Sequence, residues 1–462
     1  MQPFEVTNLF SKITSKVKPL ISLAVIVGDE EKPLVGIENL TVFRGTKKVL
    51  NKINLNLNPG EIIILEGENG SGKSTLIEAI AKIIPSNHGI VKLNGTFGLT
   101  LQKNGINEDE LVSERISYAM MVSNGDPKNM DSILEHWNMS HRKSDKIAHL
   151  SFGMKRKIAM MQGLMPGYCS NSPTFSLLDE PTEGLDKRSV KLLIDDLLTL
   201  ANKGHGFIIA THDSRISEIA TKKCLIDEGN IETKNYKLSI KNNHKLPIIS
   251  EKKGGVKLAK KEWSKTITQR TKLPFLKRGL PLLTSILVIL GIVSGLNRDT
   301  IPENIAGGLI LLPGFLAALI KPAELEYLQE NRCGDWWKAM SPDTLTTHTT
   351  ILEIIFVFFA PLVTSLIVLN GNFPEDKLLF IVCSLTILLV MFANNSIYSL
   401  AENMPRKNST YIPLLTIILI WPFLIASNMI LNERFENSIN EMILVLVIPS
   451  IIFLITPILS KK

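Results

Sequence analysis

The hydrophobic pattern divides the chain into two halves of different character. Up to about residue 235, apolar runs of strand length alternate with turns and helical stretches. Beyond residue 278 the chain contains long apolar segments, at about 281–297, 305–320, 350–370, 377–393, 410–431 and 441–459. A helix needs about 17 or more apolar residues to cross a bilayer. We therefore expect an α/β domain followed by an all-α membrane domain of six transmembrane helices.

The strongest local signal in the first half runs from Glu61 to Leu76. The apolar, mostly β-branched residues 62–65 predict a buried strand, and the helix formers from Lys73 onward predict a helix. Between them, residues 67–74 read G-E-N-G-S-G-K-S, the spacing of a phosphate-binding loop. The glycines let backbone N–H groups turn toward an anion, at the positive end of the helix dipole. We expect Lys73 to neutralise nucleotide phosphates and Ser74 to ligate Mg²⁺.

Two further apolar strands end in residues with catalytic chemistry. The strand at 174–179 ends in adjacent carboxylates, Asp179 and Glu180. Two uncompensated acids at the edge of a core are costly unless a cation meets them. We expect Asp179 to hold Mg²⁺ and Glu180 to polarise an attacking water. The strand at 206–211 ends in His212, a position that is usually structural but that points toward the γ-phosphate if the sheet is parallel.

At three other positions the residue type alone does not decide between a structural role and a role in nucleotide binding. Phe43 precedes a glycine turn and fits either an adenine-stacking ring or a core position, and Gln102 leaves a short strand, where glutamine is usually a cap or surface residue. Ser151 fits an N-cap for the basic helix that follows, and a helix N-terminus also suits a γ-phosphate. Residues 103–148 are polar, methionine-rich and helical in pattern, which predicts an inserted helical subdomain.

Together these stretches resemble the nucleotide-binding domain of ABC transporters, an α/β P-loop NTPase, over residues 34 to about 232. The resemblance implies an ATPase in which Glu180, His212 and Gln102 serve hydrolysis, and Mg²⁺ is held by Ser74, Gln102 and Asp179. It implies that ATP is bound by an adenine-stacking ring and the phosphate loop, namely Phe43, Gly67, Asn69, Gly70, Ser71, Gly72, Lys73, Ser74 and Thr75.

The signature of the family corresponds to residues 150–154, L-S-F-G-M. It departs from the usual L-S-G-G-Q at Phe152 and Met154, while Ser151 and Gly153 are kept. In this family ATP lies between the phosphate loop of one domain and the signature of another. The resemblance therefore implies that Ser151, Gly153 and the D-loop Asp186 contact ATP in trans, and a homodimer is the simplest closed arrangement.

A basic belt separates the two halves. The chain carries a net charge of +7, and residues 234–278 contain 14 Lys or Arg against two acids. Such a belt can bind nucleic acid, but it lies directly before the apolar segments, so we expect an anionic membrane surface as its partner and no nucleic acid. Residues 257–271 predict an amphipathic elbow helix on the inner leaflet.

Loop charges predict the orientation of the membrane half. The predicted inner loops carry Lys321, Arg332, Lys338, Arg406 and Lys407, and the outer loops are mainly acidic. We expect a multi-pass protein of the cell membrane with the ATPase and both termini in the cytoplasm. The inner loop 321–350 is expected to dock on the ATPase, a plain interfacial loop being the alternative. Glu353 is expected to face lipid headgroups, and Asn394 and Asn395 to cap a span.

The predicted divisions are an N-terminal extension at 1–33, the ATP-binding domain at 34–235, the linker and elbow at 236–278 and the membrane domain at 279–462. The extension shows no signal-peptide pattern and fits an interfacial helix or a helix packed on the next domain. The scattered cysteines indicate reduced thiols, with no disulfide framework and no cysteine metal site; they are Cys169, Cys224, Cys333 and Cys383.

The membrane half also resembles the membrane subunit of the cytochrome c maturation ABC transporter, the haem exporter. The resemblance rests on the patterns at 305–319, 324–334, 340–342, 405–415 and 421–425, although Cys333 stands where that family has an acid. It implies a fusion of the ATP-binding and membrane subunits that drives haem delivery or release, with haem-handling membrane proteins as partners. Trp336 and Trp337 belong to an inner loop, so they are not expected to form an extracytoplasmic haem loop.

Two other functions compete with haem export. An ABC-2-type exporter of lipid, drug or glycan suits the same signature and the same number of spans. A non-transport ABC ATPase of translation or repair fits poorly, because the second half is hydrophobic. No C-x-x-C-H motif occurs and no histidine lies in a predicted span, so haem follows only from the resemblance.

Overall fold

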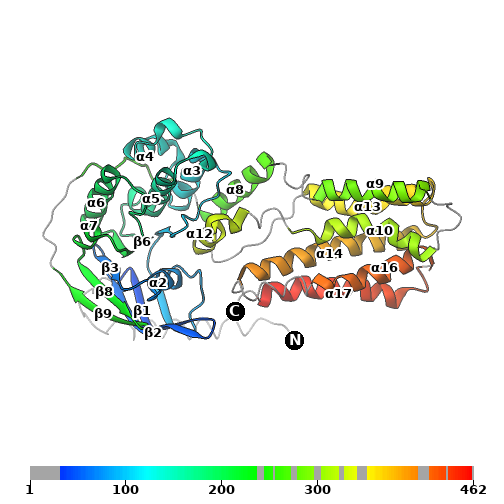
Figure 1. The fold of residues 1–462 in the computed structure, drawn as a ribbon, viewed down its shortest axis with the longest axis horizontal. Helices are drawn as coiled ribbons and strands as arrows, with labels where there is room; N and C mark the ends of the chain where they lie inside the picture. Colours follow the sequence, from blue (N-terminus) through cyan, green and yellow to red (C-terminus); the bar gives the residue numbers. More distant parts are fainter. Residues whose placement is uncertain are drawn as a thin grey trace, which may run out of the picture.

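A computed structural model describes residues 32–236, 244–252, 255–271, 278–295, 303–321, 327–340, 351–403, 416–432 and 435–459. A mixed α/β body lies at one end of the molecule and a group of long helices at the other (Figure 1). Helices α8 (Val256–Thr271) and α12 (Cys333–Met340) lie between them. The predicted extension at 1–33 falls outside the described residues except for its last two positions.

The α/β body is built on a six-stranded sheet with the order β5-β6-β7-β3-β8-β9. The first five strands of this order pair in parallel, and β9 is antiparallel to β8. The central strands are fully buried because helices cover both faces. The strands are β3 (Ile62–Glu66), β5 (Phe97–Thr100), β6 (Phe175–Asp179), β7 (Gly206–Ala210), β8 (Lys222–Asp227) and β9 (Asn230–Asn235).

A second, antiparallel sheet joins β1 (Val35–Arg44) to β2 (Lys47–Leu57) and β4 (His88–Leu93). The helices of this body are α2 (Lys73–Ile80), α5 (Phe152–Cys169), α6 (Lys187–Asn202) and α7 (Ser214–Ser217). The expected helical insertion contains α3 (Val112–Val122), α4 (Met130–His136) and the short 3₁₀ helices η1 (Pro127–Asn129), η2 (Ser140–Arg142) and η3 (Ile147–His149). The predicted P-loop α/β fold with a helical subdomain is confirmed.

Helices occupy all six predicted apolar segments in the part of the second half that the structure describes. They are α9 (Leu280–Gly295), α10 (Glu303–Leu319), α13 (Ile351–Val368), α14 (Lys377–Asn403), α16 (Ile420–Asn432) and α17 (Ile439–Leu459). By length and composition α13, α14 and α17 can each cross a membrane, and the other three are shorter apolar helices. The six helices lie side by side (Figure 1), and many of their large apolar side chains are exposed, among them Leu287, Leu378 and Leu454.

A buried polar cluster lies where this bundle begins. Arg278 is fully buried and donates to Glu353 Oε1 at 3.0 Å, to the Ala317 carbonyl at 3.0 Å and to Asn395 Oδ1 at 2.8 Å. Asn394 is likewise buried, within α14, and its amide donates to the Ala318 carbonyl at 3.1 Å.

The expectations that Glu353 faces headgroups and that Asn394 and Asn395 cap a span are therefore wrong. A buried carboxylate is tolerated when a cation pairs with it. That cation is Arg278, which lies in the basic belt outside the span of Glu353. The sequence of the span therefore gives no sign of the pair.

The predicted inner loop at 321–350 docks on the α/β body, as expected, in the residues 327–340 that the structure describes. Trp336 and Trp337 are almost completely buried in one hydrophobic cluster with residues of that body. The guanidinium of Arg115 lies 5.0 Å from the ring centre of Trp336 and 6.0 Å from that of Trp337. This loop of the second half therefore packs into the core of the first, while the six helices form a hydrophobic cluster of their own.

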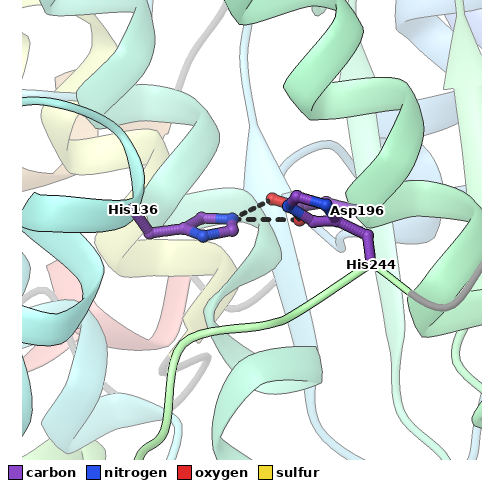
Figure 2. Close-up of side chains that lie close together, drawn as sticks. All are labelled: His136, Asp196 and His244. Carbon is purple, nitrogen blue, oxygen red and sulfur yellow. Dashed lines mark hydrogen bonds and ion pairs between the residues drawn. The ribbon is translucent and has the colours of Figure 1, made fainter.

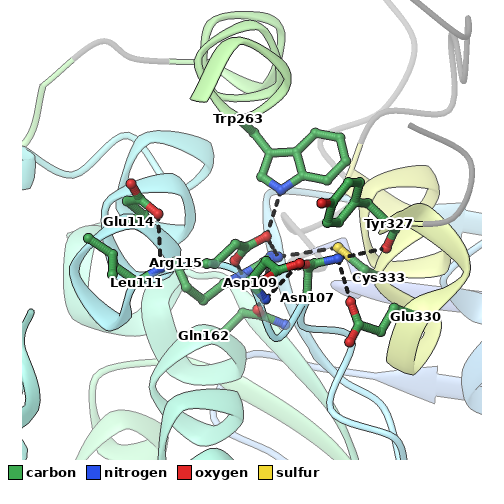
Figure 3. Close-up of polar contacts among 11 residues, drawn as sticks. Asn107, Asp109, Leu111, Glu114, Arg115, Gln162, Trp263, Tyr327, Glu330 and Cys333 are labelled. Atoms are coloured by element: carbon green, nitrogen blue, oxygen red, sulfur yellow. Dashed lines mark hydrogen bonds and ion pairs between the residues drawn. The ribbon is translucent and has the colours of Figure 1, made fainter. Parts of the chain in front are cut away.

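The elbow helix is present as α8, but its tryptophan does not face a membrane. Trp263 is fully buried, and its indole N–H donates to Glu110 Oε1 at 2.6 Å (Figure 3). Its ring centre lies 5.5 Å from that of Trp337. The prediction that this helix lies on the inner leaflet is wrong for the Trp263 face. A buried indole needs an acceptor, and the ATPase supplies one.

Glu110 and Arg115 form the centre of this junction. Both are fully buried, and both oxygens of Glu110 accept from the Arg115 guanidinium at 2.5 Å. Arg115 also donates to Cys333 Sγ at 3.3 Å, and burial raises the pKa of that thiol to about 12, so it stays neutral. The Arg115 charge is therefore balanced by Glu110.

Arg115→Ala should destabilise the protein by about 3–5 kcal/mol, because it leaves the Glu110 carboxylate buried without its cation. Thermal unfolding in detergent, followed by the fluorescence of the tryptophan cluster, measures this loss. A double variant that replaces both Arg115 and Glu110 by methionine removes both charges and should lose much less. An equal loss in the single and double variants would contradict the role of the ion pair.

Candidate nucleotide-binding site

The phosphate loop has a backbone that requires glycine. It connects β3 to α2, and Gly67, Gly70 and Gly72 have φ values of 144°, 84° and 118°. A Cβ added to Gly67 would lie 2.4 Å from the carbonyl oxygen of Ile226. Successive residues in this conformation turn their N–H groups toward one concave side, at the N-terminus of α2. The loop therefore has the form of an anion cradle.

Lys73 is positioned over this cradle. Its side chain is almost fully buried, and its ammonium donates to the carbonyl oxygens of Gly67 at 2.8 Å and Glu68 at 3.0 Å. Among the residues that the structure describes, the buried hydroxyl of Ser71 has no hydrogen-bond partner. A buried polar atom without a partner is rare in proteins. A phosphate oxygen in the loop fits both groups.

Asp179 lies at the end of β6, beside the start of α2. Burial raises the pKa of its carboxyl to about 6, and a hydrogen bond from Ser74 opposes the rise. A cation at this position would keep the carboxylate ionised. The hydroxyl and carboxylate oxygens are ligands that Mg²⁺ prefers, so these two residues fit the metal expected from the sequence.

Glu180 and His212 are brought together by the parallel pairing of β6 and β7. The His212 Nε2 lies 3.7 Å from Glu180 Oε1, and the His212 N–H donates to Glu180 Oε2 at 3.4 Å. Glu180 has a positive φ of 47°, and its backbone N–H donates to the Ala210 carbonyl at 2.8 Å. Strain of this kind in a residue other than glycine is common at functional sites.

Arg156 is a buried residue at this site that the sequence analysis did not single out. It lies on α5, and its guanidinium donates to the backbone carbonyls of both Asp179 and Glu180. Its second terminal nitrogen, Nη1, donates to the Leu101 carbonyl at 3.0 Å and to Asn104 Oδ1 at 2.8 Å. Burial lowers its pKa to about 10. Arg156 stands between Lys155 and Lys157 in a basic stretch, so the sequence gives no signal that separates it from those two lysines.

The predicted residues at the edge of the site are solvent-accessible. The Phe43 side chain, on β1, is 37% exposed, which excludes the core position and leaves the ring open to a base. Gln102 is exposed in the turn after β5, as are Asn69 and Gly70 in the phosphate loop, while Thr75 is half-buried. Among the described residues, no hydrogen bond joins Gln102 to Asp179.

The three residues predicted to act in trans lie at the N-terminal ends of α5 and α6. Ser151 caps α5 by accepting from the Met154 N–H at 3.3 Å, and Asp186 caps α6 by accepting from the Ser189 N–H at 2.7 Å. A Cβ on Gly153 would lie 2.6 Å from the Gly184 carbonyl oxygen, so the signature packs closely on the D-loop turn. No hydrogen bond joins the three to the phosphate loop within the described residues.

A glycine-lined phosphate loop beside a buried aspartate and a glutamate–histidine pair on parallel strands defines a P-loop nucleotide hydrolase. A family model described as ABC transporter matches residues 50–183. An uncharacterised ABC transporter ATP-binding protein of Methanocaldococcus jannaschii is 32% identical over 203 residues, which are 43% of this chain and 76% of that protein. The chain therefore belongs to the ABC transporter ATP-binding family.

Two other relatives have named functions. The cytochrome c biogenesis ATP-binding export protein CcmA of Gluconobacter oxydans is 30% identical over 179 residues, 39% of this chain and 81% of that protein. The macrolide export ATP-binding/permease protein MacB of Aggregatibacter actinomycetemcomitans is 25% identical over 288 residues, 56% of this chain and 44% of that protein. The predictions of an ATPase and of ATP as its ligand are confirmed at the level of the family.

Asp179→Asn should stabilise the nucleotide-free protein above pH 6. Because the pKa of Asp179 is raised by folding, ionisation of this carboxyl lowers the stability of the folded wild type. This loss of stability begins at about pH 4 and is complete above about pH 6. A rise of about 2 pKa units sets an upper limit of about 3 kcal/mol. Melting temperatures in EDTA at pH 5 and pH 8 measure the difference.

Asp186→Asn is the control, because it is expected to change the melting temperature in the opposite direction. The hydrogen bond from the Ser189 N–H lowers the pKa of Asp186, so its charge stabilises the fold above the unfolded pKa, and its removal should lower the melting temperature at pH 8. A destabilised Asp179→Asn variant at pH 8 would contradict the buried-charge interpretation.

Proposed function

We propose that this chain is one half of an ATP-driven membrane transporter and works as a homodimer. The proposed divisions are an ATPase at 34–235, a basic linker and elbow at 236–278 and a six-span membrane domain at 279–462. The ATPase and both termini face the cytoplasm. The observation that carries the proposal is the packing of the inner loop and α8 into the hydrophobic core of the ATPase.

At the ATP site, Glu180 acts as the base that polarises the attacking water, and His212 orients it toward the γ-phosphate. Lys73 and the loop N–H groups hold the phosphates, and Phe43 stacks on the adenine. Mg²⁺, when bound, supplies positive charge against the phosphate oxygens, and Ser74, Asp179 and Gln102 are the residues proposed to hold it. Support comes from the convergence of Lys73, Asp179 and Glu180 at one edge of the sheet.

The site becomes complete only with a second copy. Ser151, Gly153 and Asp186 lie in the N-terminal turns of α5 and α6, where Ser151 and Asp186 are exposed and Gly153 is half-buried, and none of them makes a hydrogen bond to the phosphate loop in the described residues. A two-fold dimer places these turns against the partner's ATP and creates two equivalent sites. ATP then holds the two domains together, and hydrolysis releases them.

Closure of the dimer is transmitted to the membrane half through two sets of contacts with the inner loop. The first starts in α2, directly after the phosphate loop, where the buried Glu78 pairs with Arg332 of the inner loop. The second starts after Gln102, where the Gly105 N–H donates to the Asn331 carbonyl at 3.0 Å and Asn107 donates to Glu330 Oε2 at 2.7 Å. Movement of either element displaces the inner loop.

For the cargo, we propose haem delivery or release in cytochrome c maturation. The support is the resemblance of the membrane half to the haem exporter and the similarity of the ATPase to CcmA. An ABC-2-type exporter of lipid, drug or glycan is the second candidate, and the similarity to MacB favours export of another compound. The partners in the first case are haem-handling membrane proteins.

Glu180→Gln should lower ATP turnover by roughly 10²–10⁴-fold and trap a nucleotide-bound dimer, because the general base is lost while binding is kept. Phosphate release and light scattering of the detergent-solubilised protein measure the two effects. Glu218→Gln, which changes an exposed carboxylate elsewhere, should keep the wild-type rate. Lys73→Ala should fail to retain ATP. Unchanged turnover in Glu180→Gln would refute the assignment of the base.

Deletion of the gene should abolish holo-cytochrome c while apo-cytochrome is still secreted. Haem spectra of membrane fractions and immunodetection of the apoprotein measure the two pools. A plasmid with the wild-type gene should restore holo-cytochrome c, and one with Glu180→Gln should not. Normal holo-cytochrome c in the deletion strain would contradict the haem proposal and favour the ABC-2-type alternative.

A further inference from the structure

Two histidines and an aspartate from three separate elements converge away from the ATP site. His136 is the last residue of α4, Asp196 lies in the middle of α6, and His244 lies in the segment 244–252 that leads to α8. The two imidazole rings approach the Asp196 carboxylate from different sides (Figure 2). One potential ligand atom from each residue lies within 4.8 Å of the others.

The spacing suits a small metal ion. The Nε2 of His136 lies 3.0 Å from Asp196 Oδ1, and the Nε2 of His244 lies 4.0 Å from the same oxygen. A tetrahedral Zn²⁺ with ligand bonds of about 2.0–2.1 Å holds its ligand atoms about 3.4 Å apart. Bringing His244 Nε2 to this spacing from Asp196 Oδ1 needs a movement of about 0.6 Å, and every pair of the three ligand atoms already lies within 4.8 Å.

The environment of each ligand is also suited to a metal. Asp196 is fully buried, and His136 Nε2 lies 3.0 Å from its Oδ1 and 2.9 Å from its Oδ2. Oδ2 also accepts from the Tyr168 hydroxyl at 2.6 Å, and Oδ1 is the oxygen that faces His244. Burial and the charge of Asp196 raise the pKa of Tyr168 well above its ordinary value, so the hydroxyl remains a donor. Outer-shell hydrogen bonds of this kind orient metal-ligating carboxylates.

The His244 ring supplies the third ligand, and its partial exposure gives an ion access to the site from solvent. In the described part of the chain no atom forms a hydrogen bond with its solvent-shielded Nε2, although the side chain as a whole is 33% exposed. Its backbone N–H donates to Thr199 Oγ1 at 3.2 Å, one turn beyond Asp196 on α6. The backbone therefore holds the ring beside the carboxylate whether or not an ion is bound.

We propose that His136, Asp196 and His244 form a binding site for a divalent transition-metal ion of the Zn²⁺ class, with a water in the fourth position. Two imidazole nitrogens and one carboxylate oxygen suit Zn²⁺ and its neighbours, whereas Mg²⁺ and Ca²⁺ prefer oxygen ligands. The site is independent of the ATP chemistry.

A bound ion would fasten the linker to the ATPase. Residues 244–252 already lie along the helical subdomain, where the Asp126 N–H donates to the Ser250 carbonyl at 2.9 Å and the Lys252 N–H donates to the Asn124 carbonyl at 2.7 Å. The far end is held by these backbone hydrogen bonds, by hydrogen bonds from Ser250 to Asn129 and by the ion pair of Lys252 with Asp126, and the metal adds a cross-link at His244. The ion therefore fixes the segment that connects the sheet to α8.

Zinc titration of the full chain in detergent tests the site. The protein is purified with a tag that contains no histidine and kept in excess Mg²⁺ without nucleotide, and Zn²⁺ affinity is measured by competition with a chromogenic chelator. We expect one ion per chain, and a loss of affinity above about 100-fold in His136→Ala and in His244→Ala. Tyr168→Phe should weaken binding by about 10–100-fold, the range found for outer-shell partners.

His141→Ala is the matched control, since this exposed histidine of η2 lies outside the cluster and its loss should leave zinc affinity unchanged. A second measurement follows the linker directly. Zn²⁺ should slow tryptic cleavage after the exposed Lys245 in the wild type and not in His244→Ala. Equal zinc affinity in the wild type, His136→Ala and His244→Ala would overturn the proposal and leave a hydrogen-bonded cluster only.

Discussion

The ion pair between Glu110 and Arg115 is the interaction on which the union of the two halves depends. Removing two charges from water costs more than their attraction returns unless other groups satisfy them. Here the indole N–H of Trp263 donates to Glu110, and the rings of Trp336 and Trp337 lie beside the guanidinium of Arg115. The helical subdomain, α8 and the inner loop each supply part of this environment. If α8 moves away, Glu110 loses the hydrogen bond from Trp263, and if the inner loop moves away, the rings of Trp336 and Trp337 become exposed to water.

The same junction lies close in sequence to the ATP site. Arg156 ties the backbone of Asp179 and Glu180 to residues 101–104, and residues 105–110 continue from there into contact with the inner loop. On the other side, Glu78 connects the helix of the phosphate loop to Arg332. Tightly packed interiors transmit small displacements because they are nearly incompressible. The carboxylates at the end of β6 and the inner loop are thus connected by a series of hydrogen bonds and packed segments.

The linker between the sheet and α8 has more structure than its composition indicates. Its lysines predict a basic belt at an anionic membrane surface, yet residues 244–252 lie against the helical subdomain and bring His244 to the buried Asp196. Further along, Arg278 enters the bundle and pairs with Glu353. Individual residues of a basic segment can therefore be fully buried when a carboxylate elsewhere in the fold meets them.

The sequence by itself determined the local features: the phosphate loop, the carboxylates at the end of β6, the helical insertion and the six apolar helices. Each depends on residues that are neighbours in the chain, so periodicity and spacing are sufficient to find it. Only the tertiary structure decided the positions of Arg156, Glu353, Trp263 and His244. Their partners lie 23 to 153 residues away along the chain. A buried polar side chain is stable only beside those partners, and one sequence does not show which distant segments the fold brings together.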